Sequence, residues 1–142
     1  MSGIPLRKAR TIIRSVFRKQ HEMNLKPLSA VVLDAGGHLQ AFERQDGASP
    51  GRFEIAQAKA YGCLMLGMGG AAQMKRAEDQ AYFIAAANGA FGGKLVPVPG
   101  GILIKTSRGT ILGALGISGD TSQNDAECGV AAIEDAGYAA EA

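Results

Sequence analysis

Lys59 is the residue whose type and position most clearly allow chemistry. It is the only lysine or arginine between Phe53 and Gln73, and small side chains surround it in a segment expected to be helical. Burying an unpaired ammonium costs several kcal/mol. It therefore needs a carboxylate, for which Asp46 on the preceding loop is the nearest in sequence, or a path to solvent. The alternative is a functional lysine that binds a carboxylate or acts as a general base with a lowered pKa.

Two glycine-containing corners, Pro99-Gly100-Gly101 and Ser118-Gly119, lie at the ends of predicted strands. Glycine leaves the backbone open, so the amides of such corners can hold an oxyanion or line a ligand pocket. The same residues also form ordinary turns. Asp125 follows in the first turn of a predicted helix, where a carboxylate either stabilises the helix dipole or contacts a ligand. In an enzyme built on Lys59, Arg44 or Asp46 would assist the lysine.

Few side chains suit a metal or a haem iron. His21 lies on a basic helix, and we interpret His38 as a partly exposed strand residue, with iron ligation as the alternative. Cys63 and Cys128 have the spacing of neither a zinc site nor a covalent haem motif, so no metal site is predicted. Methionines 65, 68 and 74 fit core packing better than a cofactor pocket.

Hydrophobic periodicity and turn residues predict the elements that position these groups. Apolar residues at three- and four-residue steps between Leu6 and Met23 indicate an amphipathic helix. Short apolar runs bounded by turn residues indicate two β-hairpins. The resulting order, helix, two strands, two helices, three strands and helix, favours an antiparallel α+β domain. The other predicted segments are the strands 28–33, 38–42, 95–96, 102–104 and 111–117 and the helices 52–68, 72–90 and 124–136.

Composition sets limits on the class of protein. A chain of 142 residues is long enough for one domain with a real core, here predicted over residues 1–142. A net charge of +2 gives no reason to expect nucleic acid as a partner, and no apolar run approaches a membrane span. Without a secretory leader the expected location is the cytoplasm. The many small residues in the helices suit tight contacts between subunits.

Three blocks of sequence resemble the GlcG/HbpS family, which includes the C-terminal domain of PduO-type proteins. They are V-V-L-D-A-G-G-H-L-Q-A-F-E-R-Q-D-G-A (31–48), A-Q-A-K-A-Y (56–61), and P-V-P-G-G-I-L-I (97–104) with G-A-L-G-I-S-G (113–119) and Asp125. The resemblance implies a five-stranded antiparallel sheet with helices packed on it, similar to profilin or PAS domains, and assembly into homo-oligomers. Family members have been linked to haem binding, corrinoid-associated operons and glycolate utilisation without one shared reaction.

Two functions follow from the residues and the resemblance together. The first is a protein of a catabolic operon that binds a small ligand or cofactor, with haem as the family's best-known ligand. The small number of histidines then predicts weak or peripheral haem binding. The second is a cofactor-independent isomerase, lyase or hydrolase acting on a small oxygenated carboxylic acid through Lys59 and the amides of the glycine corners.

Overall fold

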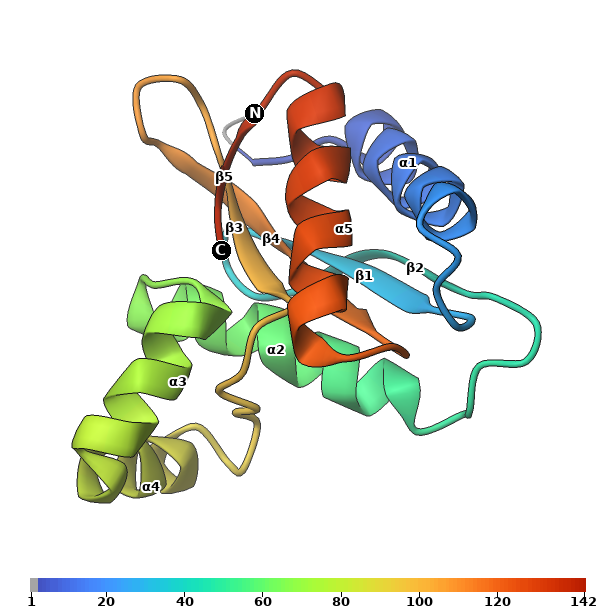
Figure 1. Ribbon diagram of the computed structural model, residues 1–142. Coiled ribbons are helices and arrows are strands. Elements are labelled where there is room, and N and C mark those ends of the chain that lie inside the picture. Colours follow the sequence, from blue (N-terminus) through green and yellow to red (C-terminus); the bar gives the residue numbers. More distant parts are fainter. Residues whose placement is uncertain (1–2) are drawn as a thin grey trace.

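The computed structural model describes residues 3–142, which form five helices and one five-stranded antiparallel sheet of order β2-β1-β4-β3-β5 (Figure 1). The predicted α+β class is therefore confirmed, as are both predicted hairpins, which pair β1 with β2 and β3 with β4. The elements in chain order are α1 (Leu6–Glu22), β1 (Ser29–Asp34), β2 (Leu39–Arg44), α2 (Arg52–Leu66), α3 (Gly70–Asp79), α4 (Ala81–Ala90), β3 (Gly101–Lys105), β4 (Ile111–Ser118), α5 (Ser122–Asp135) and β5 (Ala139–Glu141).

The sheet is the middle layer of three. Helices α1 and α5 lie side by side on one face, and α2 covers the other (Figure 1). Because side chains alternate along a strand, each strand contributes to two cores. In β1, Val32 joins the core under α1 and α5, whereas Val31 and Leu33 join the core under α2.

Helix α2 lies directly on the backbone of the central strands because glycines face it. A Cβ on Gly116 would lie 1.9 Å from the carbonyl oxygen of Ala56, and one on Gly101 would lie 2.3 Å from that of Lys59. No larger residue fits at either position without moving the helix. This close contact brings the middle of α2 to the ends of β3 and β4.

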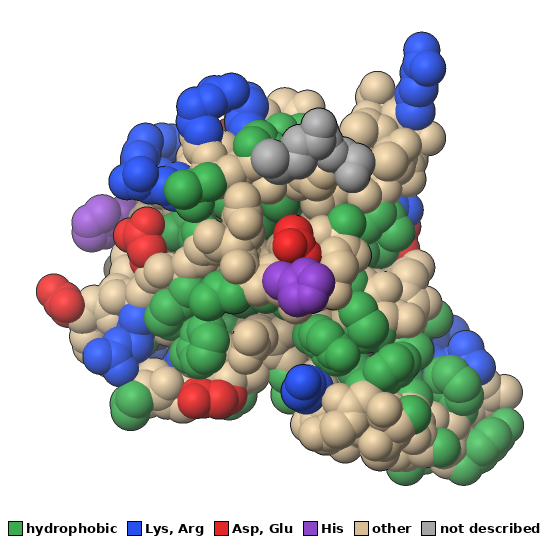
Figure 2. Space-filling view, turned by 180° about the vertical axis from the view of Figure 1, so that it is seen from behind, with side chains coloured by type: hydrophobic (Ala, Val, Ile, Leu, Met, Phe, Trp, Pro, Cys, Tyr) green, Lys and Arg blue, Asp and Glu red, His purple; other side chains and the backbone are tan. Residues whose placement is uncertain are grey.

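Helices α3 and α4 form an arm that projects from the body of the molecule (Figure 1). Helix α4 packs chiefly against α3, and Ile84 is its one buried residue. The side chain of Tyr82 is 73% exposed. Figure 2 shows hydrophobic side chains gathered on the surface of this arm.

Two predicted segments differ from the structure, and one strand of the structure was not predicted. Leu95 and Val96 form no strand, because the following prolines, Pro97 and Pro99, lack the amide hydrogens that a ladder needs. The predicted helix 72–90 is two helices, separated at Gln80 by an extended φ of −141°. Strand β5 was not predicted, since its alanines carry no β-strand signal; its pairing with β3 and the Lys105–Glu141 ion pair hold it in place.

Candidate functional site

Lys59 lies on α2 in the interior and is bound on two sides. Its ammonium donates to the carbonyl oxygen of Ile117 at 2.9 Å and to Asp125 Oδ2 at 3.4 Å. Lys59 is 3% exposed and Asp125 is 1% exposed. The carboxylate partner predicted from the sequence, Asp46, is thus corrected to Asp125, which follows Lys59 by 66 residues.

The pair joins the two helical layers around the ends of the central strands, since Lys59 belongs to α2 and Asp125 to α5. Burial lowers the pKa of Lys59 and raises the pKa of Asp125, although each charge partly offsets this effect on the other. Asp125 also accepts a hydrogen bond from the amide of Asp120 at 3.1 Å. Its position in the first turn of α5 was predicted, and both of its carboxylate oxygens are engaged.

The predicted glycine corners surround this lysine. Gly100, with φ +111°, approaches so closely that a Cβ there would lie 2.8 Å from Lys59 Nζ. Pro99, Gly100 and Gly101 are buried, so the amide groups of the two glycines are not exposed to solvent. The space between the corners holds the chain's own ammonium group.

Ser118 and Gly119 form the second corner. The hydroxyl of Ser118 is buried and accepts a hydrogen bond from Arg52 Nη1 at 3.1 Å. A Cβ on Gly119 would lie 2.3 Å from the carbonyl oxygen of Pro27. The structure therefore brings together Lys59, both corners and Asp125, and it adds Arg52, which the sequence pattern did not single out.

Arg44 and Asp46 lie elsewhere, in an open hollow of about 640 Å³ that His21 also lines. Neither residue contacts Lys59: the hydrogen-bonding partners of that ammonium are Ile117 and Asp125. The grouping of Lys59 with Arg44 and Asp46 is not found in the structure. Arg44 ends the edge strand β2, which places it on the opposite side of β1 from the glycine corners.

His38 belongs to the turn between β1 and β2 rather than to a strand. Its side chain is 80% exposed, and Nδ1 lies 3.2 Å from Asp34 Oδ1. The same Asp34 oxygen accepts hydrogen bonds from the backbone amides of Gly36 and His38, and these bonds lower the pKa of Asp34. The aspartate thus holds the turn and the imidazole together.

Both cysteine thiols are buried, and neither forms a disulfide. Burial raises the pKa of Cys63 and of Cys128 to about 12. Within residues 3–142 no three histidine, cysteine, aspartate or glutamate side chains are grouped so that they could hold a metal ion. None of the helices in that range combines the length and apolar character that crossing a bilayer requires.

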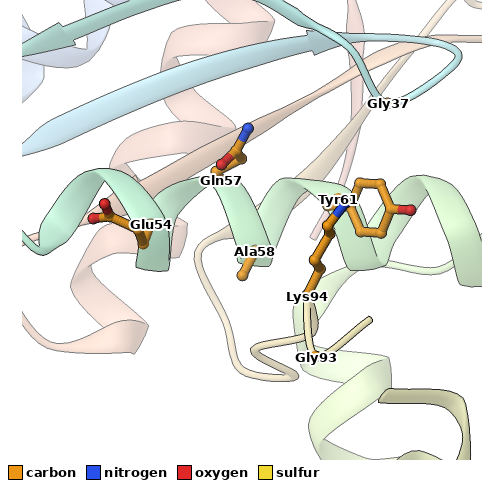
Figure 3. A pocket seen from close by; sticks show the side chains of 7 residues that line it. All are labelled: Gly37, Glu54, Gln57, Ala58, Tyr61, Gly93 and Lys94. Atoms are coloured by element: carbon orange, nitrogen blue, oxygen red, sulfur yellow. The ribbon is translucent and has the colours of Figure 1, made fainter. Parts of the chain in front are cut away.

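A cleft of about 380 Å³ runs along the outer side of α2, and we name it the α2 cleft (Figure 3). Figure 3 shows Glu54, Gln57 and Tyr61 in succession along the helix, with Lys94 reaching toward Tyr61 from the loop after α4. The Lys94 ammonium lies 5.6 Å from the centre of the Tyr61 ring. The other lining residues are Gly37, Ala58 and Gly93.

Glycines leave the α2 cleft open at both margins. A Cβ on Gly37, with φ +87°, would lie 3.3 Å from the Tyr61 ring, and Gly93 has φ +78°. Phe91 meets the same ring edge to face, with centroids 6.3 Å apart. The cleft therefore offers a fixed aromatic wall, one cation and the polar ends of Glu54 and Gln57.

Sequence reasoning missed this cleft. Its signals were the outward spacing of Gln57, Ala58 and Tyr61 on one helix and the Gly92-Gly93-Lys94 turn that approaches them. They carry no motif, and their proximity depends on how the arm returns to the sheet.

The comparisons with known proteins agree with the sequence resemblance. The family model described as haem degrading protein HbpS-like matches residues 4–134, so the chain belongs to the HbpS-like family. A search of curated proteins finds no match.

Solved structures of the same fold share little sequence with this chain. A PduOC–haem complex is 19% identical with a TM-score of 0.86, and the match covers 99% of each chain. Protein ORFY of Klebsiella pneumoniae is 22% identical, with a TM-score of 0.79 and coverage of 94% of this chain and 92% of that one. A double mutant of HbpS from Streptomyces reticuli is 19% identical, with a TM-score of 0.79 and coverage of 95% and 88%. At these identities the likeness establishes the fold.

Proposed function

We propose that this HbpS-like chain binds a small flat ligand with a carboxylate in the α2 cleft, and that haem is a member of the ligand class. The observation that carries the proposal is the pairing of Tyr61 and Lys94 in one cleft. A volume of about 380 Å³ lies within the range of small-molecule sites, roughly 300–1,000 Å³. The aromatic ring offers a stacking surface, and the ammonium offers a partner for a carboxylate.

The α2 cleft offers haem one side chain that could ligate the iron and one that could pair with a propionate. Protein ligands to haem iron include histidine, cysteine, methionine and tyrosine. Of these types only Tyr61 lines the cleft, while Lys94 is placed to pair with a propionate. His38 lines a separate hollow with Asp34 and Gly36, so its imidazole does not line the α2 cleft. This donor set supports the expectation of weak haem binding, and the names of the PduOC–haem complex and of the family support haem as the ligand to test.

We do not extend the proposal to catalysis by Lys59. A general base must reach its substrate. The ammonium of Lys59 is bound to Ile117 and Asp125 and is almost fully buried. Both acceptors of its hydrogen bonds belong to the chain itself.

Hemin titration followed in the Soret region tests the proposal on the intact protein. Lys94→Gln should weaken binding about two- to twelvefold, the effect of losing one hydrogen bond of about 0.5–1.5 kcal/mol. Ala58→Leu should weaken it further by filling the cleft. Tyr61→Phe keeps the ring but should change the spectrum, because it removes the oxygen donor. Lys75→Gln, at an exposed lysine on α3, is the matched control and should bind like the wild type.

The opposite pattern would overturn the proposal. Normal binding by both Lys94→Gln and Ala58→Leu would exclude the α2 cleft. A tight complex that is lost in His38→Ala would place the ligand on the other side of the β1–β2 turn. Bleaching of the Soret band with time, in the presence of oxygen and a reductant, would point to the degradation that the family's description names.

A further inference from the structure

The α2 cleft carries one charge of each sign, at opposite ends. Glu54 and Lys94 are the two charged groups among the residues that line it. Figure 3 shows Glu54 at one end, Lys94 beside Tyr61 at the other, and Gln57 and Ala58 between them. Glu54 and Tyr61 are seven residues apart on α2, which corresponds to a rise of about 10.5 Å. The length of the cleft therefore separates the negative end from the positive end.

Neither charge is neutralised by another side chain that the structure describes. Glu54 and Lys94 are both exposed, and within residues 3–142 neither forms an ion pair. The Lys94 ammonium lies over the ring of Tyr61, which attracts a cation without removing its charge. Each end of the cleft thus keeps its charge for a ligand.

The position of Glu54 has an ordinary explanation that covers only part of the observation. A carboxylate in the first turn of α2 stabilises the helix dipole, whichever side of the helix it lies on. Residues three, four and seven positions apart share one side of a helix, so Glu54 lies on the same stripe as Gln57, Ala58 and Tyr61. The helix dipole does not explain why the carboxylate lies on the stripe that forms the cleft wall.

The middle of the α2 cleft suits a flat, apolar body. Ala58 contributes only a methyl group there, Gly93 contributes no side chain, and the Tyr61 ring forms a stacking surface at one end. The volume of about 380 Å³ is near the low end for small-molecule sites, roughly 300–1,000 Å³. A molecule of about two rings therefore matches the space between the two charged ends.

We propose that the α2 cleft selects a flat zwitterion, with its carboxylate on Lys94 and a protonated nitrogen on Glu54. A ligand of this kind meets the opposite charge at both ends of the cleft. A dicarboxylate of the same length places one of its charges against Glu54, and like charges brought together in this way disfavour binding. The inference rests on the proposed function, because it uses the same cleft and the same role for Lys94.

Haem matches only one half of this charge pattern. Its two propionates leave the same edge of the macrocycle, and the opposite edge is hydrocarbon. With the propionates at Lys94, the carboxylate of Glu54 loses water to an apolar edge and gains no partner, which is unfavourable. Glu54 therefore contributes to the weak haem binding expected for this chain, and Glu54→Gln should bind hemin at least as tightly as the wild type.

Isothermal titration calorimetry at low ionic strength tests the proposal with three probes built on biphenyl. The zwitterionic probe has a carboxylate at one para end and an aminomethyl group at the other. The second probe lacks the amine, and the third has a carboxylate at both ends. The wild type should bind the zwitterion about two- to fivefold more tightly than the monoacid, the effect of one exposed charge pair. The diacid should bind most weakly.

Variants of the two charged residues assign this preference to the cleft. Glu54→Gln should bind the zwitterion and the monoacid equally, and Lys94→Gln should weaken the binding of both. The charge exchange E54K/K94E keeps one charge of each sign, so it should again prefer the zwitterion, bound in the reverse direction. Glu78→Gln, at an exposed glutamate on α3, is the matched control and should keep the wild-type order. Circular dichroism checks that each variant is folded.

Two results would overturn the inference: a zwitterion that binds no more tightly than the monoacid, or a preference that persists in Glu54→Gln. The effect of Lys94→Gln then decides whether the proposed function fails as well. If Lys94→Gln still weakens the binding of hemin and of the monoacid, the α2 cleft remains the ligand site and only its selectivity for a zwitterion is wrong. If Lys94→Gln changes neither, both proposals are wrong.

Discussion

Removing one member of the Lys59–Asp125 pair should destabilise the protein far more than removing both. At 3.4 Å and an effective dielectric constant of about 20, the attraction between the two charges is about 5 kcal/mol. Lys59→Met deletes this attraction and leaves a buried carboxylate without its cation, which costs about 3–5 kcal/mol of unfolding free energy. In the double variant K59M/D125L no charge remains buried. Its free energy of unfolding should return to within about 1–2 kcal/mol of the wild type.

Urea denaturation followed by far-UV circular dichroism measures these free energies, since the chain has no tryptophan for fluorescence. The single variants K59M and D125L and the double variant form a complete cycle, from which the coupling energy follows directly. We expect a coupling of several kcal/mol. Additive single effects would refute the buried ion pair. A K59M protein of wild-type stability that has lost hemin binding would show instead that Lys59 serves the ligand.

The difference in unfolding free energy between the wild type and K59M/D125L should depend on pH in one direction. Burial raises the pKa of Asp125, so the folded protein holds a proton in a range where the unfolded chain has released it. The stabilising contribution of that proton is complete below the ordinary carboxyl pKa of about 3.9 and is lost as pH rises through the higher folded value. Wild-type stability relative to K59M/D125L should therefore increase as pH falls from 7 toward about 4.5. A decrease would contradict the direction of the Asp125 shift.

Three smaller predictions follow from the packing. Gly116→Ala should lower the free energy of unfolding by several kcal/mol, because its Cβ would meet the Ala56 carbonyl. Gly89→Ala in α4 meets nothing within 4 Å and should raise that free energy by up to about 1 kcal/mol. Urea denaturation compares the two variants. Thr121→Ala should lower the free energy of unfolding by about 1 kcal/mol, since the hydroxyl accepts a hydrogen bond from the Asn124 amide at the start of α5. Thr121→Ser retains a hydroxyl and should retain most of that stability in the same assay. Both cysteines, with pKa values of about 12, should resist a thiol reagent at pH 8 until urea unfolds the chain; rapid labelling of the folded protein would contradict their burial.

Periodicity predicted most elements of this fold because each has an apolar pattern of its own. The amphipathic helix from Leu6 is one example, and its spacing alone separates its buried face from its arginines. Strand β5 could not be found in this way, since its three residues are held by partners on β3 and by Lys105. The short 95–96 segment has the apolar residues of a strand, but the prolines after it prevent pairing.

The sequence singled out Lys59, the two glycine corners and Asp125, which the structure brings together, but not the contacts that connect them. The burial of Lys59 and its need for a carboxylate follow from its neighbours in sequence. Its partner does not, because Asp125 reaches it only after β3, β4 and the start of α5 have been assembled. Asp46 is closer in sequence but lines a separate hollow with Arg44 and His21. Tyr61 and Lys94 are brought together by the return of the arm, which no local pattern encodes.

Several residues of the family-like sequence blocks form the contacts around Lys59. Gly101 and Gly116 allow α2 to lie on the strands, and Gly100, Ile117 and Asp125 form the seat of its ammonium. These residues build the junction between the helical layers and leave little room for a ligand. The α2 cleft, in contrast, is lined by side chains outside these contacts, such as Tyr61 and Lys94, which can change without disturbing the junction. A fold fixed by its glycines, with a ligand site on the outer side of α2, would allow members of one family to bind different ligands, because function resides in the site and not in the fold.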